Sequence, residues 1–198
     1  MLRSYIYITP DSDPGPGISA TNLNSIEFSS VDVNHEWKTV TLPSSFIKPV
    51  VICSDSIFNG NQPVVVRIRN VSSSFDIKLY EPNNLDVFHM VEQISYMVGE
   101  KGSWQIDGTV IEFGNIATNK LYNNGFENVN YTNDIISPTV VTQIQTHNDN
   151  EWLLTRIKNI NSTSFSIIMQ KEELLKNNNV TSSNGNYWMV CYDIRNIE

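Results

Sequence analysis

The sequence predicts an all-β protein, with two tandem antiparallel β-sandwich modules of H-type lectin-like character and an N-terminal arm. Short runs of alternating polar and apolar residues recur along the chain, and the second half of the chain repeats the first. Helical patterns are scarce, since only 170–177 could form a helical turn or two. We expect an arm or linker at 1–25, a first module at 26–110 and a second module at 111–198.

The internal repeat can be followed residue by residue. At an offset of 89 positions Asn59 corresponds to Asn148, and Arg67 corresponds to Arg156. Further upstream, Glu27 recurs as Glu112 at an offset of 85. The anchors of the repeat are Trp37, Pro49, Arg67, Asn70, Phe75 and Tyr96 in the first module and Pro138, Arg156, Asn159, Phe165 and Trp188 in the second. Collinear matches of this kind indicate duplication.

Several of these runs predict half-buried strands. The runs that contain Arg67, Arg69, Arg156 and Lys158 place those cations on one polar face. Phe75 and Phe165 each begin an alternating run, so we expect both rings to be core anchors. Tyr96 and Trp188 lie in apolar strands at equivalent positions, which favours a core role for both. Asp107 and Gly108 mark the turn of a hairpin that closes the first module and leads into the second.

Residues 1–25 stand outside the repeat. Tyr5–Ile8 is apolar enough for an edge strand, and 11–17 is rich in proline and glycine, as linkers are. This segment is either a strand added to the first module or an arm for attachment to a neighbour.

Composition and charge exclude several function classes. The net charge is −8 at pH 7 with a pI near 4.8, which argues against binding to nucleic acid. No apolar run is long enough for membrane insertion, and the N-terminus lacks a signal-peptide pattern, so we expect synthesis in a cytoplasm. The 25 asparagines suit turns and polar strand faces, or reflect an A/T-biased genome. Cys53 and Cys191 read as buried free thiols, with a disulfide as the alternative.

One set of residues carries a resemblance to a known family. The order is Trp37-x-x-Val40, Phe46-x-x-Pro49, an Arg-x-x-Asn-Val step before Phe75, and His89-x-x-Glu92 before Tyr96. This order resembles the H-type lectin-like repeat of secreted bacterial proteins and bacteriophage virion proteins, over most of 26–198. The second module lacks the His-x-x-Glu step. The resemblance implies six-stranded sandwiches, trimers and galactose-type ligands, but no sugar-contacting residue can be carried over.

The sequence contains no constellation typical of catalysis. His35, His89 and His147 fall at unrelated repeat positions without metal-ligand spacing. The acid pairs Glu92/Glu100 and Asp107/Glu112 could be imagined as glycosidase carboxylates, but we interpret them as surface charge. We therefore expect no enzymatic activity, no cofactor and no metal.

Two turns are the candidate ligand-binding regions. The candidate residues are Asn59, Asn61, His147, Asn148, Asp149 and Trp152. Amide and carboxylate groups can hydrogen-bond sugar hydroxyls, and an aromatic face can stack on a sugar ring. The alternative is that these residues only build tight turns.

Two function classes remain. The first is a structural or attachment protein of a bacteriophage virion, in its tail, fibre or head, that forms a homo-oligomer and contacts other virion proteins. The second is a carbohydrate-binding module that recognises a cell-surface glycan. The first is favoured by the resemblance, the missing signal peptide and the N-terminal arm.

Overall fold

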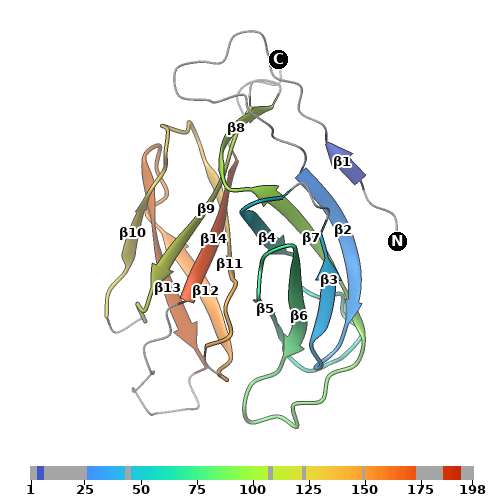
Figure 1. Cartoon of the computed structure of the whole chain (residues 1–198). Helices are drawn as coiled ribbons and strands as arrows, with labels where there is room; N and C mark the ends of the chain where they lie inside the picture. Colours follow the sequence, from blue (N-terminus) through green and yellow to red (C-terminus); the bar gives the residue numbers. More distant parts are fainter. Residues whose placement is uncertain are drawn as a thin grey trace.

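The structure of the chain is a computed structural model that describes residues 4–6, 26–42, 46–106, 109–121, 124–148, 150–172 and 185–192. Its description of side chains covers 26–42, 46–104, 110–121, 124–148 and 150–172. The described residues form strands and no helix, and every pairing between strands is antiparallel (Figure 1). The predicted all-β class is confirmed. No described helix is long and apolar enough to cross a membrane.

The strands follow the alternating runs of the sequence. The first seven are β1 (Ser4–Ile6), β2 (Ile26–Val33), β3 (Lys38–Thr41), β4 (Pro49–Cys53), β5 (Val65–Arg69), β6 (Ser74–Tyr80) and β7 (Glu92–Glu100). The other seven are β8 (Gly102–Ile106), β9 (Thr109–Thr118), β10 (Glu127–Asn130), β11 (Thr139–Ile144), β12 (Leu153–Lys158), β13 (Ser164–Lys171) and β14 (Gly185–Tyr192). In β6, buried and half-buried residues alternate strictly, as expected of a strand with one face in the core.

The strands form four sheets, and the strand order of two sheets recurs in the other two. The first pair of sheets has the orders β1-β2-β7-β4 and β3-β6-β5. The second pair has the orders β8-β9-β14-β11 and β10-β13-β12. Adding seven to each strand number of the first pair therefore gives the second pair. Arg67 in β5 and Arg156 in β12 occupy corresponding strands.

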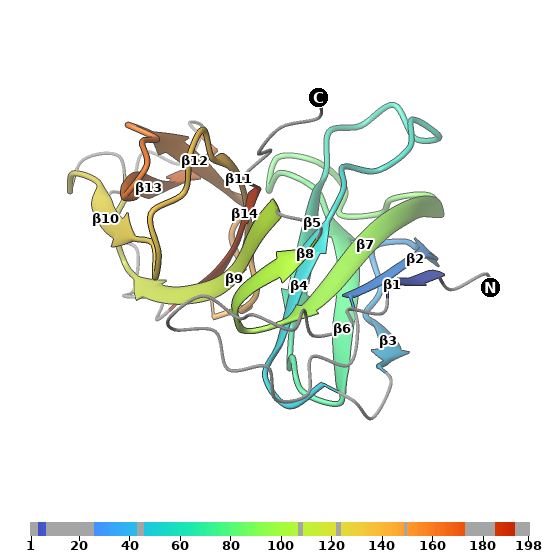
Figure 2. The same cartoon turned by 90° about the horizontal axis from the view of Figure 1, so that it is seen from above.

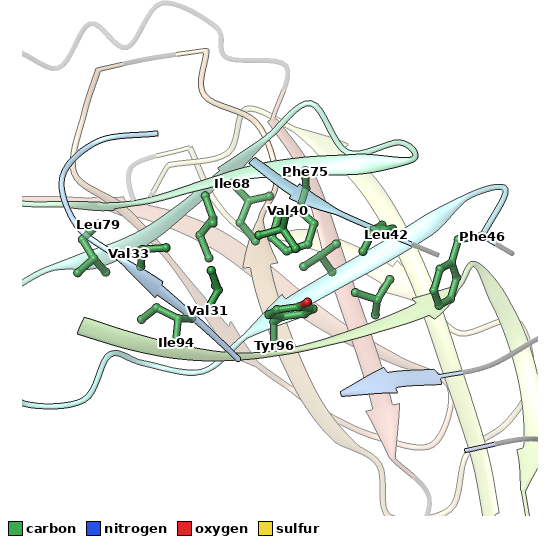
Figure 3. Close-up of a cluster of buried hydrophobic side chains, with 13 residues drawn as sticks. Val31, Val33, Val40, Leu42, Phe46, Ile68, Phe75, Leu79, Ile94 and Tyr96 are labelled. Atoms are coloured by element: carbon green, nitrogen blue, oxygen red, sulfur yellow. The ribbon is translucent and has the colours of Figure 1, made fainter. Parts of the chain in front are cut away.

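The core of the first pair lies between its two sheets. Figure 3 shows side chains from β2 and β7 pointing toward side chains from β3, β5 and β6. Phe75 is fully buried and meets Tyr96 edge-on, with 5.3 Å between the ring centroids. Phe165 is 1% exposed in the core of the second pair. The predicted core roles of Phe75, Phe165 and Tyr96 are confirmed, whereas the side chain of Trp188 lies outside the described residues.

The two pairs pack against each other through their four-stranded sheets. Ile26, Val50 and Ile52 of the first pair form one buried cluster with Ile111 and Phe113 of the second. The views in Figures 1 and 2 agree that β4 lies beside the sheet of β9, β11 and β14. A third apolar cluster thus joins the two cores.

Three local predictions have different outcomes. Gln170 and Lys171 do not begin a helix, because they extend β13 and pair with Leu154 and Leu153 of β12. The rest of 170–177 from residue 173 onward lies outside the described residues. The expected hairpin is present as β8 and β9, while Asp107 and Gly108 in its turn lie outside the described residues. Ser4–Ile6 pairs with β2 as an edge strand, and the remainder of 1–25 lies outside the described residues.

The prediction of buried free thiols can be compared with the structure only at Cys53. Cys53 is a free thiol at the margin of the first core and is half-buried. The side chain of Cys191 lies outside the described residues.

Candidate functional site

The connection between β11 and β12 fixes the second pair of sheets onto the first. We call residues 145–152 the junction loop. Arg67 donates hydrogen bonds to the backbone oxygens of Glu151, at 2.6 Å, and Thr146, at 3.1 Å. The hydroxyl of Tyr80 donates to the backbone oxygen of Asn150 at 2.7 Å. Side chains of β5 and β6 therefore hold the loop by its backbone.

The open edges of the first pair are covered by the same segment. The amide of Gln145 donates to the backbone oxygen of Val51 in β4, and that of Gln143 donates to Val66 in β5 at 3.1 Å. Edge strands with unpaired backbone groups can pair with other chains and aggregate. The junction loop and the end of β11 thus protect two edges.

Arg67 is buried because this loop covers it. The sequence places Arg67 on a polar strand face, but only 1% of its surface is exposed. Arg156, at the corresponding place in β12, is exposed and donates to the side-chain oxygen of Gln170. Strand alternation thus places Arg67 on the outer face of its own pair, but it cannot reveal that a loop from the other pair lies over that face.

Aromatic rings and cations of the first pair surround His147 of the junction loop. The junction cluster consists of Trp37, Arg69, Lys78, Tyr80 and His147. The ring of His147 lies edge-on to Trp37, at 5.1 Å between centroids, and to Tyr80, at 5.9 Å. The Lys78 ammonium lies 4.9 Å from the Trp37 centroid and 4.7 Å from that of Tyr80, and Arg69 lies 4.1 Å from Trp37. These are cation–π distances.

The local electrostatics keep His147 neutral at physiological pH. Burial and the nearby charges of Arg67 and Lys78 lower the pKa of His147 from 6.5 to about 4. Burial, followed by repulsion from Arg67 and Arg69, lowers the pKa of Lys78. Among the described residues, no carboxylate lies within ion-pair distance of Lys78. The junction cluster is thus a cationic spot in a chain of net charge −8.

A groove lies on the outer face of the second pair. It has a volume of about 410 Å³, and its described lining is Trp152, Leu154, Arg156, Gln170, Lys171 and Glu172. Lys171 pairs with Glu151 at 3.5 Å, and Glu172 accepts a hydrogen bond from the backbone of Asn83. The indole nitrogen of Trp152 is buried, and no described residue offers it an acceptor. The groove therefore has an apolar floor with polar groups at its rim.

A buried histidine fixes the other candidate turn. His89 is 1% exposed, and each ring nitrogen lies 2.8 Å from a carboxylate, Nδ1 from Glu81 and Nε2 from Glu92. The backbone nitrogen of Gly60 donates to Glu92 at 2.8 Å. A Cβ at residue 60 would lie 2.7 Å from His89, so this approach requires glycine. Burial raises the pKa of Glu92, but hydrogen bonds from Gly60 and His89 outweigh burial and leave that pKa below its usual value.

Six exposed apolar residues, which we call the apolar patch, lie on the two connections that adjoin His89 and its two carboxylates. They come from the connections β4–β5 and β6–β7: Ile57, Phe58, Val87, Phe88, Met90 and Val91. Phe58 is 90% exposed. Val87 has a φ of 59°, an unusual value for a β-branched residue. Hydrogen bonds from Asn59 and Gly60 to Val91 and Glu92 bring the two connections together, so this set of exposed apolar residues is a candidate contact surface.

The structure separates the predicted ligand-binding residues. Asn59 donates to the backbone oxygen of Val91, and Asn61 lies exposed on the same connection. His147 belongs to the junction cluster and Trp152 to the groove, while Asn148 is exposed beside them and Asp149 lies outside the described residues. Sequence reasoning missed Lys78 and Tyr80 as partners of His147. Their alternate positions in β6 place both on the outer face, which was the one available signal.

The interpretation of the acid pairs as surface charge is wrong for two residues. Glu92 and Glu112 are 2% and 4% exposed, and Asp107 lies outside the described residues. Glu112 accepts the backbone N–H of Thr132 at 2.9 and 3.1 Å, and burial raises its pKa. Glu27, its counterpart in the repeat, is fully buried in β2. Glu100, which is half-buried, accepts backbone N–H bonds from Ile47 and Lys48.

Within the part of the chain that the structure describes, no group of three His, Cys, Asp or Glu side chains is arranged to hold a metal ion. The carboxylates of Glu81 and Glu92 face one histidine from opposite sides, and the buried Glu112 orients a loop. Each of these groups thus has a structural partner.

Comparison with known proteins gives one relative. A stretch of Halomucin from Haloquadratum walsbyi is 33% identical to this chain over 174 residues, which cover 81% of the chain. The chain spans only 2% of the length of Halomucin. The chain matches no family model, and no solved structure matches it. The similarity therefore relates the chain to a small segment of a far longer protein.

Proposed function

We propose that this chain is a non-enzymatic structural module made of two copies of one β-sandwich, and that it acts by assembling with further copies. The observation that carries the proposal is the recurrence of one strand order in both pairs of sheets. Each pair encloses its own apolar core, as a sandwich does. A duplicated sandwich whose described residues include no converging set of catalytic groups is suited to building or binding.

Two further features support a structural role. Arg67 and Tyr80 donate hydrogen bonds to the junction loop, so the two pairs are joined by hydrogen bonds as well as by a buried apolar cluster. The similar stretch of Halomucin is a small fraction of a very long chain, and such a fraction suits a building block. A trimeric state stays a prediction from the resemblance alone. Membership of a bacteriophage virion and attachment through 1–25 stay predictions that rest on the sequence as well.

Sedimentation velocity over a wide concentration range tests the proposal. We expect the purified chain to form oligomers at micromolar concentration, because the exposed apolar patch needs a partner. A chain that stays monomeric at every concentration would overturn the proposal. Limited proteolysis gives an independent check that the two pairs form one unit. We expect no early cleavage that separates the first pair of sheets from the second.

A second candidate function is glycan binding at the junction cluster. Trp37 and Tyr80 supply ring faces, Lys78 supplies a cation with no described carboxylate partner, and His147 supplies a neutral imidazole. Ring faces stack on sugars, and polar groups at their edge bind hydroxyls or acidic substituents. This set favours a sugar with a negatively charged group.

A glycan array tests this second function. We expect Trp37→Ala and Lys78→Met to reduce binding of any glycan that the wild-type chain retains. Phe126→Ala is the matched control, because Lys158 lies 3.8 Å from the ring of Phe126 in a second cation–π pair away from the cluster. Equal binding by the wild-type chain and both cluster variants would reject the site.

A further inference from the structure

One face of the first pair is covered by the junction loop, while no described segment covers the corresponding face of the second pair. In the first pair, Val65 is the register partner of Tyr80, and Arg67 lies two residues further along β5. In the second pair, Leu154 is the register partner of Gln170, and Arg156 lies two residues further along β12. Arg67 and Tyr80 bind the junction loop, whereas Arg156 and Gln170 bind each other at the edge of the groove.

The first pair has a loop, 54–64, that corresponds to the junction loop. Its tip makes no contact with a strand face of the kind that His147 makes, as far as the structure describes the chain. Residues 54–64 connect β4 to β5, as 145–152 connects β11 to β12. At the repeat offset of 89, Phe58 corresponds to His147. His147 lies among the rings of Trp37 and Tyr80, but Phe58 is 90% exposed. Among the described residues, the loop 54–64 thus has an exposed tip that meets no such face, and the face around Arg156 has no loop over it.

We propose that the groove of one chain receives the 54–64 loop of a second copy, in a head-to-tail contact. This inference rests on the proposed assembly function and specifies its interface. The ring of Phe58 would lie on Trp152 and Leu154, as His147 lies against Trp37 and Tyr80 within one chain. The exposed Arg156 guanidinium would donate to backbone oxygens of the loop, as Arg67 donates to those of the junction loop.

Charge and rigidity favour this occupant. The 54–64 loop contains Asp55 and no lysine or arginine, and the groove offers Arg156, which has no carboxylate partner among the described residues. The other two charged groups of the groove, Lys171 and Glu172, have opposite signs, and Lys171 already pairs with Glu151. The loop is held in place through Asn59 and Gly60, which bond Val91 and Glu92, so it is presented as a preformed surface. A preformed loop loses little entropy on docking.

The two surfaces are different, so the contact is heterologous, and assembly continues until a ring closes or a filament forms. Either surface can therefore be blocked alone. Phe58→Asp would block the loop and leave the groove intact, and Arg156→Glu would block the groove and leave the loop intact. Both residues are exposed, so neither substitution should disturb the fold, which circular dichroism checks.

Sedimentation velocity of the full chain gives the decisive test. We expect each variant alone to raise the concentration for half-assembly about 30-fold, the effect of a central contact. An equimolar mixture of the two variants should instead form a discrete 1:1 dimer through its single intact contact. Ile47→Asp and Lys158→Glu, at exposed positions outside both surfaces, should assemble as the wild-type chain does.

The outcomes separate the two proposals. A wild-type chain that assembles while both variants assemble equally well overturns the head-to-tail contact and leaves the assembly function standing. A mixture without a dimer likewise overturns the contact. A wild-type chain that stays monomeric overturns the assembly function itself.

Discussion

Arg67 and Arg156 are the same residue type at the same place in two sheets of the same strand order, yet their surroundings are opposite. Arg67 is 1% exposed and binds two backbone oxygens of the junction loop, while Arg156 is exposed and binds Gln170. The strand position directs both side chains to the outer face. Burial is then decided by what lies over that face, which differs between the two pairs.

The phenylalanines in the two cores have different surroundings as well, since Phe75 meets Tyr96 edge-on whereas Phe165 stacks on Tyr131 beside a cleft. The core of the first pair receives side chains from both of its sheets (Figure 3). In the second pair a cleft of about 180 Å³ reaches Phe165, Ile167 and Val129. Because packing density determines how much each buried group contributes, equivalent residues should contribute unequally to stability.

The largest expected effects test this difference in the cores. Phe75→Ala should lower the free energy of unfolding by about 5 kcal/mol, and Phe165→Ala by about 3 kcal/mol, since the Phe165 ring already borders a cleft. Chemical denaturation of both variants measures the two values. Phe126→Ala, at a ring that is 37% exposed, is the control and should cost far less. A larger loss for Phe165→Ala than for Phe75→Ala would contradict the comparison.

The arginine pair should give the next largest difference. Arg67→Met should destabilise by about 2–4 kcal/mol, because it leaves the oxygens of Glu151 and Thr146 without their charged donor. Arg156→Met should stay within about 0.5 kcal/mol, as exposed substitutions do. Urea denaturation compares them, and Arg67→Lys tests whether charge alone suffices. Equal effects at Arg67 and Arg156 would mean that the junction loop contributes little.

Much of the fold could be predicted from sequence, because period-two alternation and the repeat are local signals. The alternation of 74–79 predicted a strand with Phe75 inside, and β6 has that arrangement. The burial of a strand face by a segment that is distant in the sequence leaves no such local signal. The burial of Arg67 depends on residues 79 and 84 positions away, and nothing in the run around Arg67 records them. The same limit explains why His147 was predicted as a candidate without Trp37 and Tyr80.

A smaller effect concerns the titration of His147, whose counterpart Phe58 cannot titrate. The folded pKa of about 4 lies below the ordinary 6.5, so the unfolded chain binds more protons between these values. Stability should therefore fall as pH drops from about 6.5 to about 4. In His147→Asn, the loss of stability between pH 7 and pH 4.5 should be smaller than in the wild-type chain by on the order of 1–2 kcal/mol. The value is lower than the pKa shift alone would give, because the ring is half-exposed and solvent screens its charge. Urea denaturation at pH 7 and pH 4.5 measures the difference between wild type and variant.

The smallest expected effect is at the turns that follow β5 and β12. Asn70 and Asn159 lie 89 positions apart and share one left-handed backbone conformation, with φ of 54° and 53°. Replacement by alanine should cost about 1 kcal/mol at Asn159, because residues other than glycine and asparagine rarely adopt this conformation.

At Asn70 the alanine variant should cost more than at Asn159. The Asn70 amide also donates to Asp76 at 2.9 Å, where Arg69 and Thr39 bind the same carboxylate. Glycine substitution separates the two contributions, since glycine keeps the backbone conformation and removes only the side chain. Thermal unfolding should therefore show Asn159→Gly near wild type and Asn70→Gly still destabilised. If both glycine variants match the wild-type chain, the Asp76 contact adds nothing and the two turns are energetically equivalent despite their different partners.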